Sequence, residues 1–495
     1  MAQLTGNFTG TEVADTFSGS ITQDDITFGT GEISAAAVKQ VIIDTLGGAD
    51  TIEANTQFFA IPPATAIGMT NADINTGSGA DKVNISSDLN AVNASTSIGL
   101  QNSFIETDTA GDSITISNAA TGNFDGAIGT GVLLATLDTG AGRDTIQIDS
   151  ASIGSPAEGR GSSTDTGIEQ STIVGGGGQD TITITSLADA GFSSGGTDSE
   201  SSGARGQSNV RGGDGSDRIT ITATANGSSG ITNSSTATAS GISEGTFVEG
   251  GNGADTITLS GIATRGREFA NPSNLGSAKA YGAINGNVLG GAGQDTISIT
   301  GTASVVGNAP NSEAYGVLNT NVDGGNGNDT IQIKAAGSAS GTDSIRTGAK
   351  GSNIRGGLGS DTIDISVEAT LGADDSVGAL SSTIDGGSGT DTIKTRGLKF
   401  DIQDSLILGG GGEDTFDIGV GSGTILGGKG SDLLKLDFFD ADTMSIQQAG
   451  ENGVRITGTA DKSGAAANWV QEVFEVESYE VAGVSYSAAD VVALL

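Results

Sequence analysis

Apolar and polar residues alternate in short runs along the chain, and each run follows a glycine-rich segment at a fixed distance. After GGDGSD (residues 212–217), Ile219 and Ile221 are each flanked by polar or charged residues. This period of two is typical of a β-strand with one buried face. Val210, seven residues before the aspartate that closes the segment, indicates that another short strand ends at the glycines. The glycines themselves predict a turn, because adjacent glycines permit positive φ.

The same arrangement recurs at intervals of 18 to 40 residues. In all fourteen copies an apolar residue lies seven positions before the aspartate, and in most copies a second one lies two positions after it. A further glycine recurs about thirteen residues before the aspartate, as at Gly282 and Gly316. Weaker copies carry Asp15, Asp50, Asp81 and Asp112, and near-complete copies of G-G-x-G-x-D end at Asp144, Asp180, Asp217, Asp255, Asp295, Asp329, Asp361, Asp391, Asp414 and Asp432.

One repeat is too small to bury its own apolar face, whereas stacked repeats form continuous ladders of isoleucine and valine inside. The pattern therefore predicts an all-β fold: a right-handed parallel β-solenoid (β-helix or β-roll) with about 14 long irregular coils over residues 1–440. Residues 441–495, where the repeat stops, are expected to form a small C-terminal cap. Stretches of variable length between repeats, such as 223–241, predict outward loops.

Composition narrows the functions that such a fold could carry. The formal net charge is −38, with 59 acidic and 21 basic residues, which argues against a nucleic-acid partner. The chain has no cysteine and no histidine, so disulfides, thiolate sites and histidine-based acid–base chemistry are excluded. With no HExxH motif and no separate catalytic domain, we expect that the protein is not an enzyme. We also expect no conventional signal peptide and no transmembrane segment.

The glycine-rich turn resembles the G-G-x-G-x-D-x-U-x nonapeptide of the repeats-in-toxin (RTX) family, whose members form calcium-loaded parallel β-rolls. The resemblance implies Ca²⁺ as the cofactor, several ions in all, bound by aspartate carboxylates and by backbone carbonyls of the stacked turns. It implies the carboxylate ligands Asp81, Asp144, Asp180, Asp217, Asp255, Asp295, Asp329, Asp361, Asp391, Asp414 and Asp432. It implies turn ligands at Gly175, Gly177, Gly212, Asp214, Gly250, Asn252, Gly290, Ala292, Gly324, Asn326, Gly356, Leu358, Gly386, Ser388, Gly409 and Gly427.

Simple electrostatics leads to the same cation. Stacked coils would bring the aspartates to about 5 Å from one another in one file, and unneutralised carboxylates at that spacing repel each other. Calcium prefers oxygen ligands and would remove this repulsion. The chain departs from the family pattern, because only the last interval is the family's eighteen residues. We therefore expect wide coils with one calcium column along a single edge, and the sparse glycines before Asp15, Asp50 and Asp112 leave calcium there open.

Two other glycine-rich sites are not supported by the sequence. A phosphate-binding P-loop requires G-x-x-x-x-G-K-[ST], which GGKGSD (427–432) does not match. An EF-hand requires a twelve-residue loop that ends in glutamate, and these turns do not supply it.

The C-terminal region 468–495 looks like the uncleaved type I secretion signal of RTX proteins, although a cap over the last coil would account for it equally. The resemblance implies a secreted, extracellular or cell-surface protein of a Gram-negative-type bacterium. Our first hypothesis is a structural protein that assembles with itself, through an open strand edge, into a surface layer, sheath or filament, with a cell-surface polysaccharide as a further partner. The alternative is an adhesin or a glycan- or ice-binding module that uses outward threonines such as Thr181 and Thr183.

Overall fold

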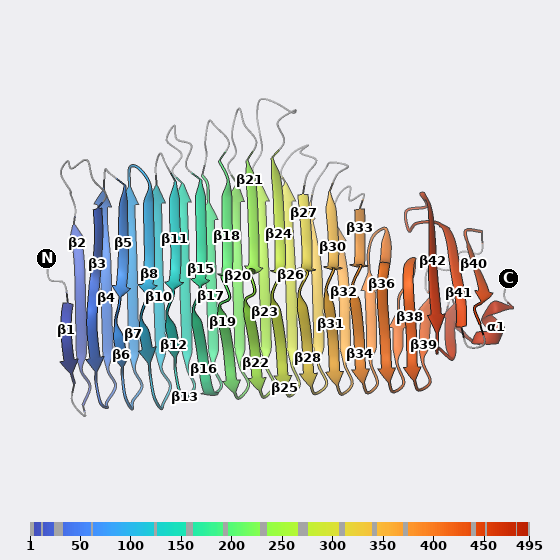
Figure 1. Cartoon of the computed structure of the whole chain (residues 1–495), viewed down its shortest axis with the longest axis horizontal. Helices are drawn as coiled ribbons and strands as arrows, with labels where there is room; N and C mark the ends of the chain where they lie inside the picture. The colour runs from blue at the N-terminus through green and yellow to red at the C-terminus, as the bar shows by residue number, and fades with distance from the viewer. Residues whose placement is uncertain are drawn as a thin grey trace.

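The computed structural model is an all-β parallel solenoid with almost no helix (Figure 1). It describes residues 4–10, 13–23, 33–60, 63–122, 126–154, 162–191, 197–227, 235–265, 276–305, 312–338, 344–369, 375–436, 442–450, 453–481 and 483–493. The prediction of a parallel β-solenoid is confirmed.

Each coil contributes to three ladders of parallel strands, which we name by their order along a coil. The first ladder contains the start of β3 (Ile33–Asp44), then β5 (Ala64–Thr70), β8 (Ser95–Gln101), β11 (Ala127–Leu133), β15 (Ser163–Glu169), β18 (Ser199–Arg205), β21 (Thr236–Ile242), β24 (Ser277–Ile284), β27 (Ser312–Leu318), β30 (Ile345–Lys350), β33 (Asp375–Leu380) and the start of β36 (Phe400–Gly411). The second ladder contains β1 (Leu4–Thr9), the end of β3, β6 (Asp73–Asn75), β9 (Phe104–Glu106), β12 (Thr136–Asp138), β13 (Ala141–Gly142), β16 (Thr172–Gly178), β19 (Asn209–Asp214), β22 (Phe247–Asn252), β25 (Asn287–Ala292), β28 (Asn321–Asn326), β31 (Asn353–Leu358), β34 (Thr383–Ser388), the end of β36 and β38 (Gly421–Lys429).

The third ladder follows the glycine-rich turn. It contains β2 (Thr16–Gln23), β4 (Thr51–Ala60), β7 (Lys82–Ala91), β10 (Ser113–Gly122), β14 (Thr145–Gly154), β17 (Thr181–Asp189), β20 (Arg218–Gly227), β23 (Thr256–Arg265), β26 (Thr296–Val305), β29 (Thr330–Ser338), β32 (Thr362–Ala369), β35 (Thr392–Arg396), β37 (Thr415–Asp417) and β39 (Leu433–Leu436).

The path of one coil explains why the motif lies along one edge. The chain passes through the first ladder, bends at a residue with positive φ such as Gln207 (φ 63°), and continues through the second ladder to the glycine-rich turn. It then returns through the third ladder on the opposite layer, so the turns lie side by side along the lower edge of Figure 1. Between Asp81 and Asp391 this path makes about nine turns of about 34 residues.

The C-terminal region closes one end of the solenoid. The strands β40 (Met444–Gln448), β41 (Gly453–Ala460) and β42 (Ala466–Phe474) form an antiparallel sheet, and β43 (Ser478–Val481) pairs antiparallel with β44 (Val484–Ser487) before helix α1 (Ala488–Val492). β42 also pairs parallel with β38, and β43 pairs parallel with β39. The cap therefore begins as a continuation of the second and third ladders.

The predicted apolar ladders form the core near the motif. Val210, Ile219 and Ile221 are at most 1% exposed, and the equivalent residues of the other coils between Ile43 and Leu434 are likewise buried. The recurring glycine of the first ladder lies where the two layers approach closely. A Cβ on Gly203 would lie 2.3 Å from Cγ2 of Ile221 and 2.5 Å from the carbonyl oxygen of Gly241. Glycine in this row therefore makes room for the isoleucine of the opposite layer.

The half of the solenoid farther from the motif has a different core, made of small residues. Ala223, Ala225, Ala237 and Ala239 are fully buried against one another. The prediction of an outward loop over 223–241 is therefore wrong at both ends, because 223–227 belongs to β20 and 236–241 to β21. Residues 228–234 lie outside the described part of the chain. Serine, threonine and alanine suggested a loop, but here their small size allows the layers to pack closely.

Candidate metal centre

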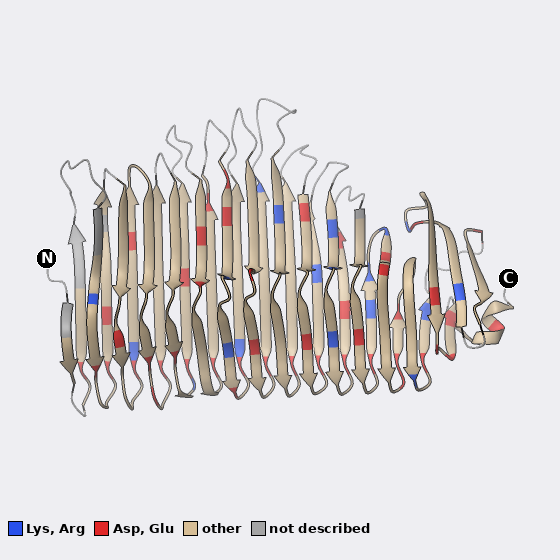
Figure 2. Ribbon diagram, in the orientation of Figure 1, with Lys and Arg blue, Asp and Glu red and all other residues tan. Residues whose placement is uncertain are grey.

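The motif aspartates lie in a single file along the edge of the solenoid, and we call this file the aspartate column. Figure 2 shows acidic residues at turn after turn along that edge. The backbone N–H of each aspartate donates a hydrogen bond of 2.6–2.8 Å to Oδ1 of the aspartate one coil further on, from Asp15 to Asp432. The structure therefore brings together all eleven aspartates that the sequence nominated as ligands, in the same register.

The second carboxylate oxygen has a different environment. From Asp50 to Asp432 the aspartates are at most 3% exposed, and their Oδ2 atoms have no hydrogen-bond partner among the described residues. Burial of a charged oxygen without a partner is unfavourable. The column thus presents a row of buried oxygen atoms that lack a donor or a cation.

The pKa values show that burial disfavours the ionised form of these carboxylates. Burial raises the pKa of Asp217 and Asp255 to about 6, and that of Asp144 and Asp391 to about 7. The hydrogen bond that each Oδ1 accepts lowers the pKa, and the negative charge of neighbouring aspartates raises it further. Without a cation, the column would hold a proton much more readily than an ordinary carboxylate does.

The first glycine of the motif lies beside the unpartnered oxygen. A Cβ on Gly250 would lie 2.5 Å from Oδ2 of Asp255 and 2.5 Å from the carbonyl oxygen of Gly290 in the next coil. The equivalent distances at Gly212 are both 2.5 Å. Both oxygens consequently face the side of the glycine where any other residue would carry its side chain. The same arrangement recurs at Gly175, Gly290, Gly324, Gly356, Gly386, Gly409 and Gly427, where the last glycine faces the carbonyl oxygen of Glu475.

The next two glycines of the motif shape the turn. Gly213 and Gly215 have φ of 118° and 133°, and a Cβ on either would lie within 2 Å of a carbonyl oxygen of the preceding coil. The prediction that the glycines permit positive φ is confirmed at these positions.

The residue between them was also nominated, as a source of backbone oxygen, and in later coils the structure shows its carbonyl hydrogen-bonded to the preceding coil. Asp214, Asn252, Asn326, Leu358 and Ser388 are exposed on the outer side of the turn. The carboxylate of Asp214 accepts a hydrogen bond of 2.7 Å from Nδ2 of Asn252, away from the column. At this position the carbonyl oxygens of Asn252, Ala292, Asn326, Leu358 and Ser388 accept N–H groups of the preceding coil, at 2.6–2.7 Å. Gly177, the corresponding residue of an earlier coil, is half-buried.

One row of residues beside the column was not recognised from the sequence. Thr45, Thr76, Thr107 and Thr139 stand five positions before their aspartates, where later coils have the first glycine of the motif. They are at most 1% exposed. The signal was available in the sequence as a threonine in the same register, but the weak copies were read only as lacking glycine.

The oxygen atoms of the column fit a hard divalent cation such as calcium. Carboxylate and carbonyl oxygens are the ligands that calcium prefers. Among the described residues there is no group of three or more acidic side chains that could hold a metal ion by themselves. Backbone oxygens would therefore have to supply much of the coordination, and the carbonyls that face Oδ2 are in place to do so.

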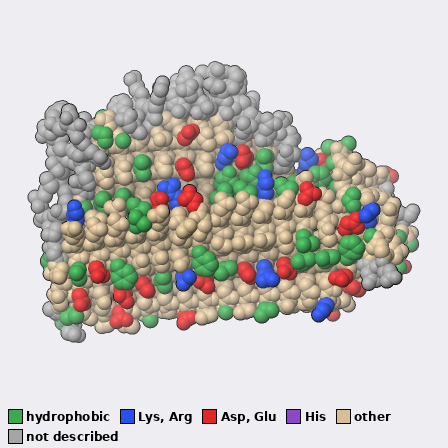
Figure 3. All heavy atoms as spheres, in the orientation of Figure 1, with side chains coloured by type: hydrophobic (Ala, Val, Ile, Leu, Met, Phe, Trp, Pro, Cys, Tyr) green, Lys and Arg blue, Asp and Glu red, His purple; other side chains and the backbone are tan. Residues whose placement is uncertain are grey.

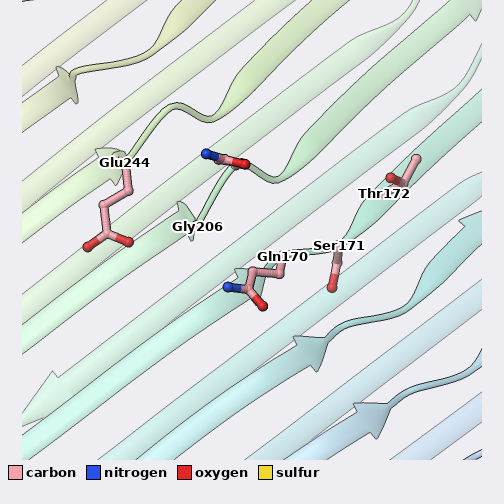
Figure 4. A pocket seen from close by; sticks show the side chains of 6 residues that line it. Gln170, Ser171, Thr172, Gly206 and Glu244 are labelled. Atoms are coloured by element: carbon pink, nitrogen blue, oxygen red, sulfur yellow. The ribbon is translucent and has the colours of Figure 1, made fainter.

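A cavity of about 560 Å³ lies away from the column, at the bend between the first and second ladders. Gln170, Gln207 and Glu244 line it from neighbouring coils. Figure 4 shows Gln170, Ser171, Thr172 and Glu244 around it. Glu244 is the one ionisable side chain among its described lining residues, so the cavity offers no acid–base pair. In the described part of the chain, no helix is both long and apolar enough to cross a membrane.

Comparison with known proteins does not assign the chain to a family. No protein-family model matches the chain, and a search of curated proteins gives no match.

Proposed function

We propose that the protein is a secreted, calcium-binding structural protein of the RTX kind, in which a column of calcium ions makes the β-solenoid rigid. The observation that carries the proposal is the row of buried Oδ2 atoms without partners, which from Asp180 onward face a backbone carbonyl across a glycine. Calcium at these oxygens would replace the missing hydrogen bonds and neutralise adjacent carboxylates. Metal binding to stacked turns then contributes directly to folding free energy.

The finer features of the fold belong to this proposal. Counting the turns at both ends as well gives fourteen coils, one for each motif aspartate. We take the coils to be right-handed, since crossovers between parallel strands have that hand in about 98% of cases. Secretion by a type I route, with the signal in the C-terminal region, follows the resemblance to RTX proteins. An enzymatic role remains disfavoured because the chain has no histidine or cysteine.

Assembly of the protein with itself through its ends is the second part of the proposal. Within the described residues, β1 and β2 each pair with a strand on one side, whereas β39 is followed by the cap. Along the lower half of the face in Figure 3, acidic and basic side chains are interspersed. Ion pairs such as Arg211–Glu249, at 3.3 Å, link neighbouring coils there. Such a mixed surface favours hydration, so we place the contact between subunits at the strand edge.

Electron microscopy and thermal unfolding test the two parts separately. With millimolar calcium we expect filaments or layers and a raised melting temperature, and with EGTA we expect dispersed molecules that have lost β-structure by circular dichroism. An unchanged spectrum and melting temperature in EGTA would refute the calcium column. Dispersed monomers at millimolar calcium, with a raised melting temperature, would refute assembly alone.

A second candidate function is favoured by the outer face of the third ladder. The strand register places Thr181 and Thr183 of β17 beside Arg218 and Thr220 of β20, and Thr220 beside Thr258 of β23. A regular array of hydroxyl groups could bind a glycan or ice. Ice-recrystallisation and glycan-array assays test this function, and no effect in either would leave threonine as an ordinary exposed strand residue.

A further inference from the structure

The residue five positions before each aspartate divides the column into two parts. It is threonine before Asp50, Asp81, Asp112 and Asp144, and glycine before each column aspartate from Asp180 to Asp432. The change occurs once, between Thr139 and Gly175. Asp15, which follows Gly10, lies at the end of the column and outside this inference.

The threonine hydroxyl binds the backbone oxygen that the glycine coils leave facing the carboxylate. Thr139 Oγ1 donates a hydrogen bond of 2.7 Å to the carbonyl oxygen of Gly175 in the next coil. Thr107 Oγ1 donates one of 3.0 Å to the carbonyl of Thr139, and Thr45 Oγ1 donates one of 2.5 Å to that of Thr76. In the glycine coils, the equivalent carbonyl and Oδ2 approach the same empty side of the glycine. The hydroxyl therefore occupies the position through which an ion would reach both oxygens.

Three of the four threonines donate this bond, whereas Thr76 Oγ1 has no hydrogen-bond partner among the described residues, although Thr76 is fully buried in the same register before Asp81. In all four coils the threonine side chain fills the space that glycine leaves open beside the carboxylate in the later coils.

We propose that calcium occupies the column only from Asp180 to Asp432, and that threonine side chains close the coils of Asp50 to Asp144 without a metal ion. This inference rests on the calcium-binding function proposed above. It removes Asp81 and Asp144 from the ligands that the sequence nominated. It also divides the solenoid into a metal-independent N-terminal part and a metal-dependent C-terminal part.

Hydrogen exchange of the full-length chain tests the division directly. In EGTA, amides of β19, β22, β25 and β28 should lose protection at least tenfold relative to calcium, while those of β7 and β10 change less than about twofold. Equal loss in both parts would overturn the division and keep calcium binding. No difference between calcium and EGTA anywhere would overturn both proposals.

A matched pair of aspartate variants provides a second test by calcium stoichiometry. Asp255→Asn and Asp112→Asn both keep an oxygen that can accept the N–H of the preceding aspartate. Native mass spectrometry in calcium should show that Asp255→Asn loses at least one ion, whereas Asp112→Asn loses none. Loss of an ion from Asp112→Asn would overturn the inference.

Thr139, the last threonine before the change to glycine at Gly175, allows a test of whether removal of the hydroxyl creates a calcium site. Thr139→Gly removes the hydroxyl beside Asp144 and should gain one calcium ion, whereas Thr139→Ser keeps the hydroxyl and should gain none. Circular dichroism in calcium establishes that both variants fold. A folded Thr139→Gly variant with the wild-type number of ions would contradict the role given to the hydroxyl.

Discussion

Among single residues, Asp165 is a buried carboxylate outside the column with both oxygens hydrogen-bonded. It lies in β15 and is 1% exposed. Its Oδ1 accepts a hydrogen bond of 2.7 Å from Ser150, and its Oδ2 accepts hydrogen bonds from Ser186 (2.7 Å) and the backbone N–H of Leu187 (3.0 Å). Burial nevertheless raises the pKa of Asp165 to about 7.

Asp165→Asn should therefore stabilise the protein as the pH rises. Because the pKa in the folded state lies above the unfolded value of about 3.9, the wild-type protein loses stability between about pH 4 and pH 7 as Asp165 ionises. Asparagine does not titrate and can still accept the N–H of Leu187. Relative to wild type, the variant should gain on the order of 1–3 kcal/mol in unfolding free energy at pH 8 over pH 5. Urea unfolding at both pH values measures this, and a pH-independent difference would contradict it.

The row of close-approach glycines predicts an effect of the opposite sign. Gly203→Ala would bring a Cβ within 2.3 Å of the Ile221 side chain, so we expect a loss of about 1–3 kcal/mol in unfolding free energy. Gly411→Ala is the matched control, because a Cβ at this position would have no other atom within 4 Å and the backbone φ is not positive. Thermal unfolding in calcium compares the two. Equal, small losses would show that the layers can separate at little cost.

The sequence predicted positions where every coil carries the same type of residue. It did not predict the role of positions where the residue type changes from coil to coil. Val210 and Ile219 were placed in the core because the same positions are apolar in other coils. The burial of Asp165 depends on Ser150 and Ser186, which pair with each other between β14 and β17. Later coils have alanine or glycine at this position, as at Ala223 and Gly261, so the serines were not recognised as partners of a carboxylate.

The turn position of Asp214 was nominated as a source of backbone oxygen, but in later coils the carbonyls at this position, as in Asn252 and Ala292, accept N–H groups of the preceding coil. The motif alone does not show which way a turn carbonyl points.

At the scale of elements, the cap continues the hydrogen bonding and strand pairing of the coils. The backbone N–H of Asp432 donates a hydrogen bond of 2.8 Å to Oε2 of Glu477, as it would to the next aspartate of the column. Ser478 pairs with Leu433, so Glu477 occupies the register of a motif aspartate. The sequence predicted a cap from the end of the repeat, but the glutamate was not recognised because its segment has no glycine-rich turn.

A buried ion pair attaches the cap to the solenoid. Lys462, between β41 and β42, pairs with Asp401 of β36, and their side chains are 9% and 0% exposed. Asp401 also accepts the backbone N–H groups of Gly397 (2.9 Å) and Gly419 (2.8 Å). Burial raises the pKa of Asp401, and the positive charge of Lys462 opposes this rise.

Lys462→Met should consequently loosen the cap. It leaves Asp401 buried without its cation, which should cost about 3–5 kcal/mol of unfolding free energy, while the double variant with Asp401→Asn should recover much of that loss. Hydrogen exchange in β41 and β42 reports the local effect. Lys279→Met is the control, since its 3.1 Å pair with Glu313 is partly exposed and should contribute less than about 1 kcal/mol. No recovery in the double variant would contradict the account.

At the scale of the whole molecule, repeated oxygen sites along one edge should give strong selectivity for calcium. Calcium accepts six to eight oxygens at about 2.3–2.6 Å in flexible geometry, whereas magnesium requires an octahedron at about 2.0–2.1 Å and retains water. The aspartates are buried, and the strand register fixes their spacing from coil to coil. A cation that keeps its water would therefore fit poorly between the turns.

We expect calcium to raise the melting temperature of the full-length protein on the order of 10 °C at a hundredfold excess over its dissociation constant, since each filled site contributes about 2.7 kcal/mol. Magnesium at the same concentration should produce a small fraction of that shift. Differential scanning calorimetry after EGTA treatment measures both, with potassium chloride of equal ionic strength as the control for screening of the net charge of −38. Equal shifts with calcium, magnesium and potassium chloride would mean that general screening, and not coordination in the column, stabilises the solenoid.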